Sequence, residues 1–185
     1  MVTQTFNLLP ILKLSIYLAF TQVLFSEFKP TITNTLGNEG VTTAVVQPDG
    51  KVIAGGVFDS AEGVARNNLA RFYQHGTLDS TFNPNVNGEV EQIVLQDDGK
   101  IIIAGNFSSV GGSSKSYLAR LNEDGGIDPN FSTVVNGKVN AVSLQIDGKI
   151  LIGGHFTSVN STTRNYLARL YRFSKRLSEK GLYIH

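Results

Sequence analysis

A motif that recurs every 49 residues constrains this chain more than any other feature. Each copy contains Asp-Gly-Lys, then a run of apolar residues, then phenylalanine; the copies begin at Asp49, Asp98 and Asp147. Leu-Ala-Arg recurs at the same spacing, at residues 69–71, 118–120 and 167–169. A period of about 40–50 residues is typical of propellers and solenoids. We therefore expect a β-repeat array over residues 27–170, with units at residues 39–87, 88–136 and 137–170.

Each unit is predicted to contain four short antiparallel strands. Asp-Gly between the first two strands indicates a two-residue type I′ hairpin turn, in which both central residues have positive φ. The second strand is apolar at consecutive positions, as in residues 101–104, which predicts burial on both faces. Face-to-face stacking of propeller blades buries inner strands in this way. The expected fold is all-β: tandem four-stranded antiparallel blades in an open or partial β-propeller of about three repeats.

The later part of each unit gives two more expectations. A turn near His75 would place Arg71 opposite Asp79, and the equivalent turn would place Arg120 opposite Asp128. On an exposed surface such an ion pair contributes less than about 1 kcal/mol. The glycines at positions 56, 105 and 154 indicate a bend or a close approach of neighbouring backbone.

Residues 1–26 read as a signal-like or hydrophobic N-terminal segment. Lys13 precedes an apolar stretch at residues 14–25, which is the length of a secretory h-region and too short for a comfortable membrane span. The alternatives are a hydrophobic helix or strand packed on the array, or a degenerate earlier repeat. The second is suggested by residues 24–30, because their Leu, Ser, Phe and Pro match residues 78–84 in spacing.

Composition excludes several classes of function. The 16 basic and 15 acidic residues nearly cancel, so we expect no positive electrostatic field that would attract nucleic acid. Contact with a membrane is expected only if the N-terminal segment stays uncleaved. Without cysteine the chain has no disulfides and no thiol chemistry. Residues 171–185 form a divergent basic tail that lacks the Asp-Gly turn and the fourth strand of the other units.

The pattern Gln-x-Asp-Gly-Lys, followed by Leu-Ala-Arg-Leu-x-x-Asp-Gly-x-Ile-Asp-x-x-Phe, resembles the delta-60 repeat over residues 24–170. That family occurs in long bacterial proteins, often secreted, and is thought to form β-propeller-like modules. The resemblance implies the fold and a secreted or cell-surface location; a cytoplasmic location stays open. It carries no agreed catalytic residues or ligand. This chain departs from the family in its small number of units and its divergent tail.

No catalytic constellation, cofactor site or metal site is predicted from the sequence. The polar loops at residues 59–67, 108–116 and 157–165 are the most variable repeated surface, and repeat arrays commonly bind through loops on one face. The candidate binding residues on these loops are Ser60, Glu62, Arg66, Ser109, Ser113, Lys115, Ser158, Asn160 and Arg164.

Three hypotheses for the function follow. The favoured one is a non-catalytic, exported module for scaffolding or for binding a protein or glycan. The second is a propeller-type hydrolase or lyase acting on carbohydrate, since propellers gather catalytic groups from several blades. The third is a fragment of a larger repeat protein without independent function. Blade faces left uncovered at the ends of an open stack further predict self-association.

Overall fold

The computed structural model describes residues 28–35, 37 and 40–171. The signal-like segment at residues 1–26 lies outside the described residues, as does the basic tail beyond Tyr171. Regular structure in the described part consists of strands, without a helix. Accordingly, the described residues hold no helix of the length and apolar character that a membrane crossing needs.

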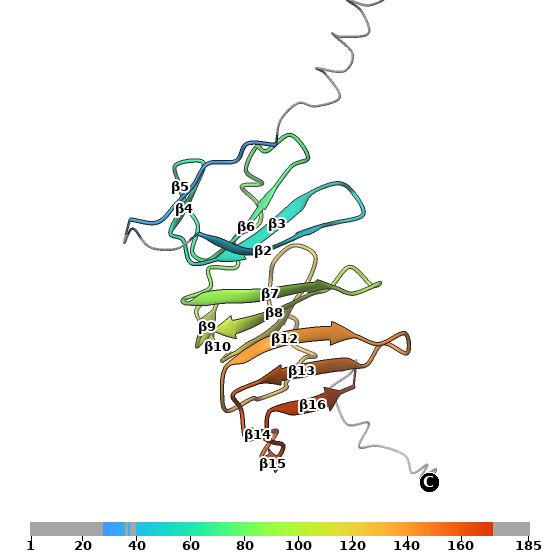
Figure 1. Cartoon of the computed structure of the whole chain (residues 1–185). Helices are drawn as coiled ribbons and strands as arrows, with labels where there is room; N and C mark the ends of the chain where they lie inside the picture. The colour runs from blue at the N-terminus through green and yellow to red at the C-terminus, as the bar shows by residue number, and fades with distance from the viewer. Residues whose placement is uncertain (1–27, 36, 38–39, 172–185) are drawn as a thin grey trace, which may run out of the picture.

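Nine of the strands form three antiparallel sheets of three strands each, one per repeat unit, stacked along the molecule (Figure 1). The sheets are β2 (Val41–Val46), β3 (Val52–Gly56) and β6 (Leu69–Phe72); β7 (Glu89–Leu95), β8 (Ile101–Asn106) and β11 (Leu118–Leu121); and β12 (Val139–Leu144), β13 (Ile150–Gly154) and β16 (Leu167–Leu170). In each sheet the second strand lies in the middle. The expected all-β array of repeated units is confirmed, and the stack is open rather than a closed ring.

The fourth strand of the first and second units is shorter than expected. Only isolated bridges join Phe72 to Leu78 and Leu121 to Ile127. Immediately after the first bridge, the Asp79 carboxylate accepts a hydrogen bond from the Thr81 amide at 3.1 Å, which turns the chain away from the sheet. The same residue types that gave a strand pattern thus form a turn, because an aspartate side chain competes for the backbone donor.

The Asp-Gly turns also differ from the expected type I′ geometry. The glycines have positive φ, 83° at Gly50 and 78° at Gly99, but the preceding aspartates do not. Gly50 donates to the Gln47 carbonyl at 2.9 Å, and Gln47 donates to the Lys51 carbonyl at 2.7 Å. This is a three-residue loop, a turn followed by a left-handed glycine, and it inserts one residue more than the expected type.

The polar loops at residues 59–67, 108–116 and 157–165 fold into small hairpins. They are β4 (Ser60–Ala61) with β5 (Val64–Ala65), β9 (Ser109–Val110) with β10 (Ser113–Ser114), and β14 (Ser158–Val159) with β15 (Thr162–Thr163). Each hairpin follows the middle strand of its sheet, so the three occupy equivalent places along the stack (Figure 1).

Residues 28–33 lie on the first unit as residues 82–87 lie on the second. In β1 (Ile32–Thr33), Ile32 pairs with Ala61, just as Val86 pairs with Val110. The Phe28 ring meets the Phe72 ring edge to face, with centroids 6.0 Å apart. The described part of residues 24–30 therefore agrees with the interpretation that this segment is the end of an earlier unit.

Two apolar cores lie between the sheets, and the middle strand of the second unit contributes to both. Ile101 and Ile103 face the first unit, whereas Ile102 and Ala104 face the third, and all four are fully buried. The prediction that this strand is buried on both faces is confirmed. The close backbone approach predicted at Gly105 is also confirmed, since a Cβ there would lie 2.2 Å from the Glu89 carbonyl oxygen.

Candidate functional site

An asparagine bracket fixes the root of the second and third hairpins. The Asn87 side-chain oxygen accepts hydrogen bonds from the backbone amides of Ser108 at 2.9 Å and Ser109 at 2.8 Å. Asn136 holds the amides of Thr157 and Ser158 at 2.9 and 2.8 Å. Sequence reasoning missed these two asparagines. The available signal was Val-Asn-Gly, which recurs at residues 86–88 and 135–137 at the repeat spacing.

The cationic position of the first and second hairpins serves as an anchor. Arg66 is only 5% exposed, and its guanidinium donates to the Ser80 carbonyl at 3.0 Å and the Ala65 carbonyl at 2.8 Å. Lys115 reaches the Phe131 carbonyl at 3.2 Å. These two side chains tie the hairpin to the segment that leaves the same sheet, so Arg66 in particular points inward and not toward a partner.

The remaining predicted residues divide into two groups. The serines at the first strand of each hairpin are half-buried: Ser60, Ser109 and Ser158. The other residues are exposed: Glu62, Ser113, Asn160 and Arg164. The exposed residues do not meet in one cluster, because each hairpin belongs to a separate sheet.

Two of the exposed residues at the hairpin tips also accept hydrogen bonds from the segment that precedes their own sheet. Asn160 accepts from the Val134 amide at 2.8 Å, and a Glu62 carboxylate oxygen accepts from the Thr31 amide. Both residues have positive φ, 48° and 51° respectively. The tips are therefore held in place by hydrogen bonds, and only part of their polar surface faces solvent.

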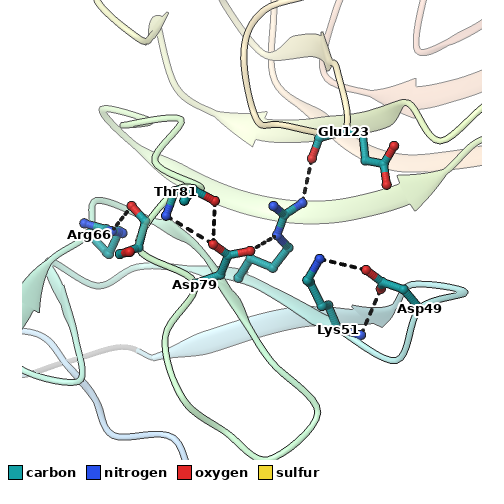
Figure 2. A network of polar contacts seen from close by, with 8 residues as sticks. Asp49, Lys51, Arg66, Asp79, Thr81 and Glu123 are labelled. Carbon is teal, nitrogen blue, oxygen red and sulfur yellow. Dashed lines mark hydrogen bonds and ion pairs between the residues drawn. The ribbon is translucent and has the colours of Figure 1, made fainter.

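The ion pair predicted between Arg71 and Asp79 is present, at 2.9 Å, but it is buried rather than exposed. Figure 2 shows Asp79 between Thr81 and the guanidinium, which also donates to the Glu123 carbonyl of the next unit at 2.6 Å. Stacking of that unit removes the pair from water. Burial raises the pKa of Asp79, but hydrogen bonds from Thr81 and the Arg71 charge outweigh it and hold the pKa below its ordinary value.

The equivalent pair in the second unit is more deeply buried. Arg120 contacts Asp128 at 2.8 Å, and both side chains are 1% exposed. The Lys100 ammonium lies 3.4 Å from the same carboxylate. Burial again raises the Asp128 pKa, but the Asn130 amide, Arg120 and Lys100 together hold it below the ordinary value. The expectation of an exposed, weak pair was therefore wrong for both units.

Two carboxylates converge at the first strands of the second and third sheets. Glu89 lies 3.3 Å from the Lys138 ammonium, and Glu91 contacts the same ammonium and accepts from the Asn140 side-chain amide nitrogen at 2.8 Å. Hydrogen bonds to Glu91 and then Glu89 raise the Lys138 pKa. Both carboxylates are thus engaged in an ion-pair network between blades. The enzymatic hypothesis stays a prediction.

A shallow cleft of about 430 Å³ separates the turn tips of the first and second units. Its polar walls come from Gln47, Asp49, Gln96, Asp97 and Glu123. Asp49 is already paired with Lys51 of its own turn at 2.8 Å. Within the described part of the chain, no group of three or more histidine or acidic side chains is arranged to hold a metal ion.

A family model described as "Domain of unknown function (DUF5122) beta-propeller" matches the chain three times, at residues 47–82, 96–131 and 145–170. The matches fall one in each sheet unit and together cover more than half of the 185 residues. No curated protein matches the chain.

Proposed function

We propose that this chain, which belongs to the DUF5122 β-propeller family of unknown function, is a non-catalytic module that binds a protein or glycan partner. Scaffolding by a rigid stack of blades is part of the same proposal. We assign the repeat to the delta-60 type on its Asp-Gly-Lys and Leu-Ala-Arg pattern.

One observation carries the binding role: the three hairpins share a frame of antiparallel pairing but differ at their exposed positions. In the second and third hairpins the Asn87 and Asn136 brackets also fix this frame. The exposed strand positions read Val64, Ser113 and Thr162 in the three units. A constant frame that presents variable side chains is the arrangement by which repeat proteins build binding surfaces.

The chemistry of this face favours an uncharged partner. In the second and third hairpins, β10 and β15 consist of exposed hydroxyl residues only, Ser113–Ser114 and Thr162–Thr163. Hydroxyl groups both donate and accept hydrogen bonds, which suits the hydroxyls of a neutral glycan or a peptide backbone. The cations of the same hairpins donate to backbone carbonyls, Lys115 to that of Phe131 and Arg164 to that of Thr163.

The test replaces two exposed hydroxyl residues together, Ser113→Lys and Thr162→Lys. A control pair at the opposite turns, Asp97→Lys and Ile146→Lys, has the same substituted residue at exposed sites. Affinity electrophoresis in dextran, mannan or xylan measures glycan binding, and chemical cross-linking in the native extract measures protein binding. We expect retardation or specific cross-links with wild type and control that the hairpin variant loses. Equal behaviour of all three proteins would refute the hairpin face.

Export is proposed on separate grounds, the apolar stretch at residues 14–25 behind Lys13. Cell fractionation with N-terminal sequencing tests it. We expect the chain outside the cytoplasm, whereas an intact chain found only in cytosol would contradict export without affecting the binding proposal.

A further inference from the structure

The third unit leaves open a face that is covered in the other two units. Leu167 is 66% exposed, whereas Leu69 and Leu118 at the same repeat position are 0% and 1% exposed. Leu118 belongs to the core that the second unit forms with the third. The difference therefore arises from the neighbour and not from the residue. We call the surface of Leu151, Leu167 and Arg169 the trailing face.

The first unit leaves open the opposite face. Val41 is 48% exposed, whereas Val90 and Val139 at the same repeat position are fully buried against the preceding unit. Ala44 and Val46 on the same strand are also exposed. We call the surface of Phe28, Val41, Ala44 and Val46 the leading face. At both internal junctions of the stack, a trailing-type face packs against a leading-type face.

Each internal junction also contains an arginine stacked on a phenylalanine ring. The Arg71 guanidinium lies 4.4 Å from the Phe82 ring centroid, and Arg120 lies 4.8 Å from the Phe131 ring centroid. Both rings are buried, at 0% and 1% exposure. Arg169 holds the same repeat position in the third unit but is exposed. One period after Phe131 the sequence has lysine, so the repeat offers no ring there.

The matching ring stands on the leading face. A Cβ on Gly76 would lie 3.2 Å from the Lys29 backbone, as a Cβ on Gly125 would lie 2.9 Å from the Phe82 ring. Phe28 thus occupies on the first unit the place that Phe82 occupies on the second. It is 40% exposed, and no arginine among the described residues stacks on it. In the described part of the chain, one end of the stack therefore presents an exposed arginine and the other end a partly exposed ring.

We propose that a second copy of this chain docks head to tail, its leading face on the trailing face of the first copy, with Phe28 beneath Arg169. The contact repeats the geometry of the two internal junctions, which is why a second copy fits better than an unrelated partner. Such a contact is heterologous and closes into a ring when the rotation permits. Two copies supply six units, within the usual range of about four to eight blades in closed propellers.

The test uses analytical ultracentrifugation of the full chain at micromolar concentration. Leu167→Glu on the trailing face and Val46→Glu on the leading face each place a charge on an apolar contact at an already exposed site. We expect a wild-type dimer, and a dissociation constant raised at least about tenfold by either variant. Ile146→Glu, at a still more exposed apolar residue on a turn tip, is the control and leaves the dimer unchanged.

Mixing the two variants separates head-to-tail docking from a symmetric contact. The leading face of the Leu167→Glu chain and the trailing face of the Val46→Glu chain are both intact, so the mixture is expected to form a heterodimer. Exchange of the stacking partners, Arg169→Phe with Phe28→Arg, is expected to restore association that Arg169→Phe alone weakens. A wild-type monomer would overturn the proposal, as would association that depends on one face only.

Discussion

The second and third units carry nearly the same third strand, yet the strand has two different environments. Leu118–Leu121 is buried at all four positions, whereas Leu167–Leu170 alternates between exposed and buried. Both strands read Leu-Ala-Arg-Leu and both pair with the middle strand of their sheet. The difference teaches that the local sequence sets the strand, and that the neighbouring unit decides how many of its faces are buried.

The arginine of this strand shows the same contrast in its electrostatics. Arg120 is enclosed with Asp128 and Phe131, while Arg169 is exposed. One period after Asp128 the sequence has leucine instead of a carboxylate. The same repeat position therefore holds a buried, paired arginine in the second unit and an exposed arginine in the third. The following predictions test this comparison by equal substitutions in the two contexts.

The largest effect is expected from Arg120→Ala. Removal of the guanidinium leaves the Asp128 carboxylate buried with less compensation, which costs about 3–5 kcal/mol of unfolding free energy. Arg169→Ala, the same substitution on the exposed strand end, is expected to change stability by less than about 0.5 kcal/mol. Urea denaturation of the monomeric chain measures both. Equal losses would show that burial of the pair does not control its contribution.

Next comes truncation of the first leucine of the strand. Leu118→Ala removes a side chain from the core between the second and third units and is expected to cost about 2–5 kcal/mol. Leu167→Ala, at a position uncovered in the monomer, is expected to stay within about 0.5 kcal/mol when the monomeric chain is measured. The two midpoints in urea give the comparison directly. A large loss for Leu167→Ala would mean that another segment covers the trailing face.

A smaller effect is expected at Gly55, which lies on the face of the first unit that packs against the second unit. A methyl group on Gly55 would come within 2.7 Å of Val90 and 3.0 Å of Ile93, so Gly55→Ala overpacks the first junction and costs roughly 1–3 kcal/mol. At Gly153 the nearest atoms lie 3.7 Å away, and Gly153→Ala is expected to be neutral or slightly stabilising. Thermal unfolding distinguishes the two outcomes, and destabilisation of equal size would contradict them.

The smallest effect concerns pH. The Asp128 pKa lies below its ordinary value of about 3.8, so its ionised form stabilises the fold above that pH, and the contribution disappears as the pH falls through the folded pKa. Lys100→Met removes one nearby charge, raises the Asp128 pKa, and costs less than about 1 kcal/mol at neutral pH.

Lys149→Met is the matched control for this titration. Lys149 occupies the same repeat position but pairs with Asp147 of its own exposed turn. Carboxyl NMR titration should therefore show an unchanged Asp128 pKa in this variant. If Lys149→Met and Lys100→Met moved the Asp128 pKa equally, the shift would be a long-range charge effect and not a contact in the second unit.

The repeat, the strand order and the Arg71–Asp79 pairing could be predicted from the sequence, because they depend on local spacing and on turn position. Sequence reasoning missed the burial of that pair, which requires knowledge of the unit stacked above it. It also placed the Asp-Gly turn one residue too short, since Asp-Gly is compatible with more than one hairpin loop. The binding-face residues were chosen from loop variability. The inward direction of Arg66 follows from carbonyl groups, at Ser80 and Ala65, that no motif marks.

By itself, the 49-residue repeat determined that this chain builds three equivalent β-sheet units. Alternating and consecutive apolar positions specify strands and the faces they offer, because side-chain direction follows backbone period. Only the tertiary structure decided which of those faces are covered, and hence that Leu118 is core while Leu167 is surface. Burial belongs to a pair of surfaces and not to one, so identical strands acquire different roles from the neighbours on which they stack.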